Sequence, residues 1–168
     1  MAVREIRRYG DPVLREKAAS VADVDAVRTV VEDMLDTLEK ADGVGLAGPQ
    51  IGESVRIVVV HPPAETDEER EDPRVFVNPE IVERFGPQTT AEEGCLSIPG
   101  VFETVKRPSG VAVRAVDGNG DPFEVRAEGL LSRILQHEID HLDGVLFVDR
   151  IGPMRRALLS KRLREFLD

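Results

Sequence analysis

The sequence predicts a mixed fold of α-helices and β-strands built around one buried helix. Three segments, 25–41, 130–143 and 153–167, show apolar residues at helical spacing or a helix start signal. The segments between the first two read as short strands, the last two of which are joined by a strong hairpin signal. A chain of 168 residues, 41% hydrophobic and 32% charged, is expected to be soluble and to form a single domain spanning 1–168.

The helix expected at 130–143 carries the most informative motif, with His137 and His141 four residues apart and Glu138 directly after the first. This spacing places both imidazoles on one stripe of the helix, where they can bind one metal ion. Glu138 lies on the flank of that stripe, in the position of a general base that takes a proton from an attacking water. Apolar residues around the helix predict that it is largely buried, and Gly144 is expected to end it. The alternative is an amphipathic helix that shows this spacing by chance.

The N-terminal third is expected to hold an arm, a helix and a glycine-rich loop. Residues 1–21 read as an arm laid over the core. In the helix at 25–41, Asp23 or Asp25 is the candidate N-cap. The loop at 43–52 contains a GxGxxG match, but a dinucleotide site needs a strand before it and a helix after it, whereas here a helix precedes and a proline follows. Its glycines are expected to let the backbone approach a ligand closely.

The rest of the chain alternates short strands and loops. Strands are expected at 55–60, 75–78, 81–85, 111–116, 123–127 and 145–148. The acidic, proline-rich segment 61–73 reads as an exposed loop, with His61 as a surface residue. Asp117–Asp121 is a hairpin turn that leads towards the central helix, and Pro153 begins a last helix that runs to about Leu167.

Charge and cysteine content limit the location and the partners. A net charge of −10 argues against general affinity for DNA or for an anionic membrane, because phosphate groups are bound through clustered Lys and Arg. The N-terminal segment has no apolar run typical of a signal or membrane segment, so a cytoplasmic location is expected. The single cysteine excludes an internal disulfide and fits a reducing compartment.

A third metal ligand must come from outside the central helix. A catalytic metal needs about three protein ligands and one open position, and the helix supplies two. Cys95, in a turn bounded by glycine and proline, is the best candidate, because one thiolate and two imidazoles leave the fourth tetrahedral position to water. The alternative is a small buried thiol that serves only in packing.

Three segments in this order, GVGLAGPQIG at 43–52, EGCLS at 93–97 and QHEIDH at 136–141, resemble the peptide deformylases. GDPVLR at 10–15 extends the resemblance, which covers most of the chain. It implies an α+β fold in which antiparallel β-sheets surround the central HExxH helix, with an N-terminal helix and a C-terminal helix. It also implies a metallohydrolase that removes the N-formyl group from the N-terminal formylmethionine of newly made polypeptides and releases formate.

The resemblance also implies catalytic roles. The metal ligands would be Cys95, His137 and His141. Glu138 would be the general acid and base of the reaction. The Gln50 side chain and the Leu96 backbone N–H would hold the formyl oxygen, as two donors aimed at a developing oxyanion.

The substrate peptide, in the same resemblance, would run extended along the backbone of Val44 and Gly45. Its methionine side chain would enter a pocket formed by Val44, Ala91, Leu130 and His137. The chain departs from the family pattern at Gly48, where alanine is usual, and at Arg133, where an aliphatic residue occurs. Arg133 is expected to pair with Glu93 and to present only its alkyl stem to the pocket.

The resemblance implies a particular metal and particular partners. The ligand set would bind zinc more tightly than iron, yet Fe²⁺ is implied in the cell, with Zn²⁺, Ni²⁺ or Co²⁺ able to substitute. The implied partners are N-formylmethionyl nascent peptides. The basic residues of the last helix could form a contact with ribosomal RNA or simply a solvated surface. These residues are Arg155, Arg156, Lys161, Arg162 and Arg164.

The HExxH pattern and the cysteine also fit two other functions. The HExxH pattern also serves zinc peptidases, which would be expected to have a third ligand downstream of the helix. A metal-stabilised binding module without enzymatic activity would close its site with a fourth Cys or His. The chain has no second cysteine, and His61 lies in a polar loop.

Overall fold

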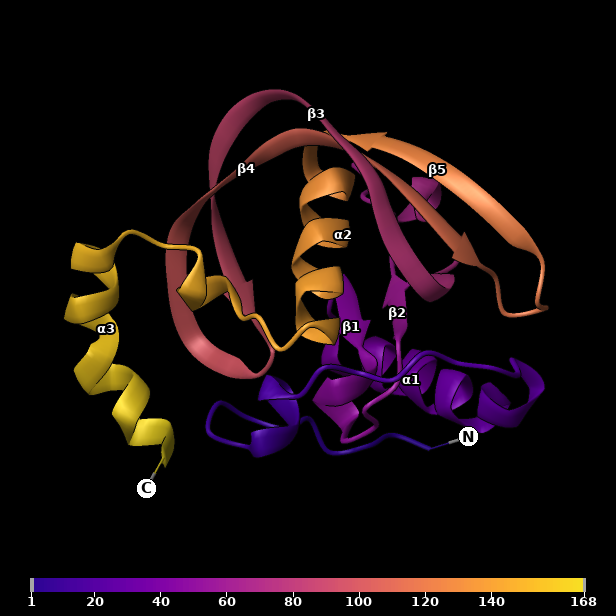
Figure 1. Ribbon diagram of the computed structural model, residues 1–168, viewed down its shortest axis with the longest axis horizontal. Coiled ribbons are helices and arrows are strands. Elements are labelled where there is room, and N and C mark those ends of the chain that lie inside the picture. Colours follow the sequence, from indigo (N-terminus) through magenta and orange to yellow (C-terminus); the bar gives the residue numbers. More distant parts are fainter. Residues whose placement is uncertain (1, 168) are drawn as a thin grey trace.

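A computed structural model describes residues 2–167 and shows helices packed on an antiparallel sheet (Figure 1). The α-helices in this part of the chain are α1 (Arg28–Ala41), α2 (Gly129–Leu142) and α3 (Pro153–Arg164). The strands are β1 (Gly45–Ala47), β2 (Ile57–Val60), β3 (Arg74–Cys95), β4 (Ile98–Val116) and β5 (Pro122–Glu128), which neighbour one another in that order. The expected α+β fold, with a central helix and a helix towards each end, is confirmed.

Strands β3 and β4 form a long hairpin that curves around α2 (Figure 1). Their pairing shifts register four times, between Val77 and Glu80, between Ile81 and Glu83, between Phe85 and Gln88, and between Gly94 and Cys95. Each shift adds local bend and twist to the ladder, as β-bulges do. The hairpin can therefore surround a helix rather than lie flat, and it ends with Cys95 beside α2.

Strand β2 is buried on both faces and separates two parts of the core. Val58 and Val60 pack in the cluster that contains the apolar side of α2. Ile57 and Val59 pack in the cluster that contains the apolar side of α1. A strand covered on both faces reads as a continuous apolar run, which is how this segment appears in the sequence.

Helix α2 is largely buried, as expected, with ten of its fourteen residues in the interior. Its polar residues there have partners, since the Gln136 amide donates to Ser132 Oγ and to Pro108 O, both at 3.0 Å. The helix ends as expected, because Gly144 follows it with a φ of 73°. Within the described residues, no helix is long and apolar enough to cross a membrane.

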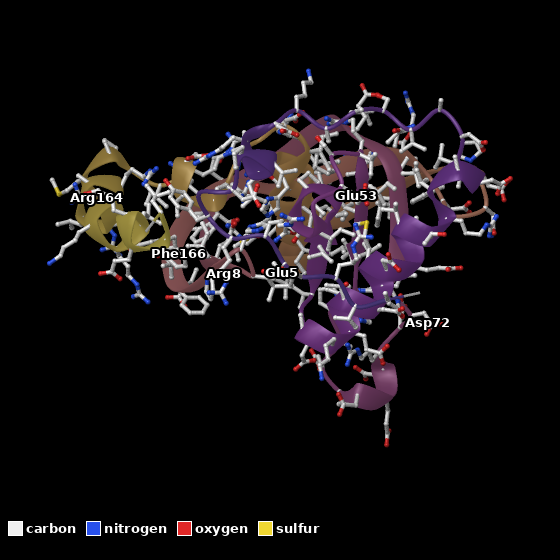
Figure 2. All side chains as sticks on the ribbon, turned by 90° about the horizontal axis from the view of Figure 1, so that it is seen from below. Glu5, Arg8, Glu53, Asp72, Arg164 and Phe166 are labelled. Carbon is white, nitrogen blue, oxygen red and sulfur yellow. The ribbon has the colours of Figure 1, made fainter. Side chains whose placement is uncertain are left out.

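The N-terminal arm crosses the loops that lead into the centre of the molecule. Arg7 N–H donates to Gln50 O at 2.7 Å, and Tyr9 N–H donates to Ser97 O at 2.8 Å. Figure 2 shows this arm, with Glu5 and Arg8, lying across one face of the molecule. The arm thus holds the backbone at Gln50 and at Ser97, two residues after Cys95.

Three local expectations need correction. The strand expected at 145–148 is wrong, because Leu146, Phe147 and Val148 are buried in an apolar cluster without pairing to any described strand, and a 3₁₀-helix forms at Phe147–Asp149. The strands expected at 75–78 and 81–85 are parts of one strand, β3. Neither N-cap candidate caps α1, whose N-cap is Val27; Asp23 instead accepts a hydrogen bond from Asp25 N–H in the turn before it.

We predict that Gly144→Ala lowers the free energy of unfolding by about 1–3 kcal/mol, the usual cost of a strained backbone residue. A Cβ atom here would lie 2.6 Å from Arg15 O, on a backbone with a φ of 73°. Urea unfolding measures the change. Gly118→Ala is the matched control, because a Cβ atom there meets nothing within 4 Å. Equal unfolding midpoints for the two variants would contradict the prediction.

Candidate metal centre

Cys95, His137 and His141 converge at the end of the β3–β4 hairpin. Their ligand atoms all lie within 4.8 Å of one another, and Cys95 Sγ is 3.5 Å from His141 Nε2. A tetrahedral ion with bonds of about 2.0–2.3 Å separates its ligands by roughly 3.3–3.8 Å. The distance from Cys95 to His141 falls in this range, and the three residues together could hold one ion. No other such group is found in the described part of the chain. The three predicted ligands are thus brought together from a strand end and a helix.

His137 is held by a buried carboxylate. Its Nδ1 lies 2.9 Å from Glu93 Oε1, and an ionised carboxylate can only accept, so Nδ1 carries the proton. The other ring nitrogen, Nε2, is left for a metal. A histidine that donates one ring N–H to a carboxylate while the other nitrogen binds metal is a common arrangement, and it fixes the tautomer and the orientation of the ring.

Two arginines hold the same Glu93 carboxylate. Arg107 donates to both oxygens, at 2.7 and 3.0 Å, and Arg133 donates to Oε2 at 2.7 Å. The expected pairing of Arg133 with Glu93 is confirmed. Burial alone would raise the pKa of Glu93, but hydrogen bonds from His137 and Arg107 bring this pKa well below its ordinary value. Glu93 is therefore ionised at neutral pH.

Glu138 lies beside the ligand atoms rather than among them. Its side chain is buried, and Oε1 is 3.9 Å from His141 Nε2 with no hydrogen-bond partner among the described residues. Burial raises the pKa of Glu138 to about 7, while burial lowers that of His141 well below its ordinary value. A neutral His141 suits metal ligation, and a carboxyl group with such a pKa can both accept and release a proton near neutral pH.

The Gln50 amide is fixed in one orientation. Its Oε1 accepts from Ala47 N–H at 2.9 Å, and its Nε2 donates to Ser97 Oγ at 3.1 Å and points at Cys95 Sγ, 3.6 Å away. The N–H groups of the amide thus face the ligand cluster. Ser97, which sequence reasoning did not single out, is part of this arrangement.

The presence of glycine rather than alanine at position 48 has a steric explanation. A Cβ atom at this position would lie 2.7 Å from Val55 O and 2.8 Å from Glu53 O. Alanine, the residue usual in the family pattern, would therefore need the backbone around Val55 to move. The glycine at position 48 therefore reflects close packing of the loop against Glu53 and Val55, which are not metal ligands.

A cavity of about 480 Å³ opens beside the ligand atoms. Residues expected at the site that line it are Val44, Gly45, Gln50, Cys95, Leu96, Leu130, His137 and Glu138. Ala91 is not among its lining residues and is exposed on β3. Arg133, whose guanidinium reaches Thr89 O, lines the cavity instead.

The free edge of β1 faces this cavity through Gly45. Val44 O accepts from His61 N–H at 2.8 Å, which continues the pairing of β1 with β2 by one residue. In an antiparallel ladder the backbone groups of the next residue then point the other way, to the unpaired edge. Gly45 therefore offers its N–H and C=O at this edge, while Val44 contributes an exposed side chain. His61 is only partly exposed, and its Nε2 lies 3.1 Å from Arg70.

These features define an α+β metallohydrolase with one cysteine and two histidines at an HExxH helix. The sequence model of the polypeptide deformylase family matches residues 3–157. The chain is 41% identical to the peptide deformylase of Thermodesulfovibrio yellowstonii, over 98% of each chain, and 48% identical to that of Clostridium botulinum, over 89% of this chain and 97% of the relative. The chain belongs to the polypeptide deformylase family.

Solved structures agree with this assignment over nearly the whole chain. The structure resembles a peptide deformylase from Legionella pneumophila with a TM-score of 0.87 at 44% identity, covering 98% of this chain and 95% of that one. It resembles the peptide deformylase from Thermus thermophilus with a TM-score of 0.87 at 42% identity and the same coverage.

Gly45→Ala should lower deformylase activity by about 10²-fold, the order of loss that a small misplacement of a reacting group produces. A Cβ atom at Gly45 would lie 2.6 Å from Glu138 Oε2 and would displace this carboxylate. Formate release and metal content are measured together, and metal content should be unchanged. Gly152→Ala, where a Cβ atom meets nothing within 4 Å, is the control. Full activity in Gly45→Ala would show that the position of Glu138 is not restricted in this way.

Proposed function

We propose that this chain removes the N-formyl group from the N-terminal formylmethionine of newly made polypeptides and releases formate. The observation that carries this proposal is the convergence of Cys95, His137 and His141 beside Glu138 and Gln50 in a member of the polypeptide deformylase family. We further propose that residues 1–168 act as one catalytic domain in the cytoplasm.

Cys95, His137 and His141 would hold one divalent ion, Fe²⁺ in the cell, with Zn²⁺, Ni²⁺ or Co²⁺ as substitutes. The proximity of their ligand atoms and the neutral state of His141 support this role. When bound, the ion would polarise the formyl carbonyl and make a nucleophilic water available near neutral pH. The thiolate and imidazole ligands suit the softer divalent metals.

Glu138 would take the proton of the attacking water and deliver it to the leaving amine nitrogen. Its burial, its pKa of about 7 and its unpartnered Oε1 support both transfers. Gln50 Nε2 and the backbone N–H of Leu96 would donate hydrogen bonds to the formyl oxygen as negative charge develops there. The contact of Gln50 Oε1 with Ala47 N–H supports this role, because it turns the amide N–H groups towards Cys95.

The peptide would add as a strand to the edge of β1, with hydrogen bonds to Gly45. The methionine side chain would enter the cavity of about 480 Å³, between Leu130 and the stem of Arg133. A carbonyl that bears only hydrogen would be accepted between Gln50, Leu96 and the metal ligands, whereas an acetyl methyl would crowd this space. Formyl peptides should therefore react far faster than acetyl peptides.

The alternative functions have less support. A zinc peptidase would take its third ligand downstream of α2, whereas the third ligand atom that lies near the two histidines belongs to Cys95, upstream. A metal-stabilised module would use a fourth protein ligand, and the cluster in the described residues has three. We also propose a ribosome contact through the basic helix α3, which lies at one end of the molecule, where Figure 2 labels its last residue, Arg164.

The proposed reaction is tested with a formyl-Met tripeptide and its acetyl counterpart. We expect formate release and an N-terminal mass loss equal to one CO from the formyl peptide only. Glu138→Gln is the matched variant: it keeps the shape of the side chain, so metal should stay bound while the rate falls by at least ~10²-fold. Internal cleavage fragments in proportion to enzyme would favour the peptidase instead.

Cys95→Ala should remove or strongly weaken binding of the divalent ion, because the thiolate is one of three ligands. Metal content is measured by elemental analysis after loading with Zn²⁺ or Fe²⁺ and desalting. In the wild type we expect one ion per chain, and the Fe²⁺ form should lose activity in air, since a thiolate next to iron is open to oxidation. Unchanged metal content and turnover in Cys95→Ala would make the ligand assignment wrong.

A further inference from the structure

Arg133 is a buried arginine whose contacts go beyond its ion pair with Glu93. It lies on α2 four residues before His137, and it is 8% exposed. Its Nη1 donates to Val105 O at 2.9 Å, and its Nη2 lies 3.0 Å from Thr89 O and 3.3 Å from Thr89 Oγ1. One side chain of α2 thus reaches acceptors on both strands of the β3–β4 hairpin.

The metal ligands depend on how this hairpin sits against α2. Two ligands, His137 and His141, are on α2, whereas Cys95 is at the end of β3. Three ligands from two elements can bind one ion only if the elements keep a fixed separation. Directional hydrogen bonds between the two elements restrict this separation, because their strength falls steeply when distance and angle change.

Arg133 acts next to two of the ligands. Its partner Glu93 lies two residues before Cys95, and the same carboxylate binds His137 through its other oxygen. Three residues after His137, Asp140 of α2 accepts a hydrogen bond from Arg107 of β4 at 2.9 Å. The helix is therefore hydrogen-bonded to the hairpin both before His137, through Arg133, and after it, through Asp140.

We propose that Arg133 is a positioning residue that fixes α2 against the β3–β4 hairpin and thereby sets the geometry and affinity of the metal site. This inference rests on the proposed metal site of Cys95, His137 and His141. Arg133 does not ligate the metal or touch the reacting atoms. Its role is to hold Thr89, Glu93 and Val105 in place relative to His137.

The test compares metal binding in Arg133→Met, Arg133→Lys and wild type, with Zn²⁺ and Co²⁺ as probes. Arg133→Met keeps a stem that can line the cavity but loses every hydrogen bond of the guanidinium. We expect its Kd for Zn²⁺, from competition with a chelator, to rise by about 10–100-fold, the usual cost of losing a group that supports a metal ligand. The absorption bands of the Co²⁺ form should shift. The lysine variant, with one donor group, should fall between.

Arg155→Met is the control for the loss of an arginine ion pair, because Arg155, whose side chain is 61% exposed, donates to Glu103 at 2.7 Å and not to Glu93. Its Kd and Co²⁺ spectrum should match wild type. A lower unfolding temperature of Arg133→Met with an unchanged Kd and Co²⁺ spectrum would overturn the proposal, because Arg133 would then only stabilise the fold. If Arg133→Met does not fold, an unchanged Kd in Arg133→Lys overturns it. Absence of metal binding by wild type would instead overturn the proposed function.

Discussion

The ionised carboxylate of Glu93 is only 7% exposed, and a buried carboxylate is stable only when hydrogen-bond donors surround it. Its two oxygens accept from Arg107 on β4 and from Arg133 and His137 on α2. An ionised carboxylate at this depth without these donors would be costly, since desolvation of a charge must be offset by pairing. Glu93 therefore holds three elements together at one point: β3, which ends in Cys95, β4, and α2, which carries both histidines. The orientation of His137, the wall of the cavity and the place of Cys95 all depend on that arrangement.

The burial that stabilises α2 also sets its chemistry. Because the helix is enclosed by apolar side chains of β2, β3 and β4, Glu138 has few neighbours that solvate a charge, and burial raises its pKa to about 7. The backbone of β1 comes close to this carboxylate only because Gly45 has no side chain. The same close approach places the free edge of β1 along the cavity. Packing, proton transfer and peptide binding thus share the same few residues.

The sequence predicted the parts of the site that depend on local spacing. His137, Glu138 and His141 lie within one turn of one helix, and helical periodicity places them without further information. Cys95 was open to a second interpretation, because its position depends on a long hairpin whose bends and register shifts carry no simple sequence signal. Arg107 was missed, because residues 98–110 were not predicted to form a strand and the direction of its side chain was therefore not considered. Its inward direction could have been noticed, since Val101, Val105 and Arg107 share one face of β4. The apolar run at 145–148 was read as a strand, since burial alone does not reveal whether a partner strand is near.

X-ray absorption at the metal edge of the Zn²⁺-loaded protein tests the central claim most directly, because it reports the atoms bonded to the ion. We predict one sulfur neighbour at about 2.3 Å and two imidazole nitrogen neighbours at about 2.0–2.1 Å, with the remaining position filled by a light atom. The same spectrum should be obtained for Glu138→Gln, because Glu138 is placed beside the ion and not on it. Absence of the sulfur neighbour, or a change of the first coordination shell in Glu138→Gln, would contradict the account.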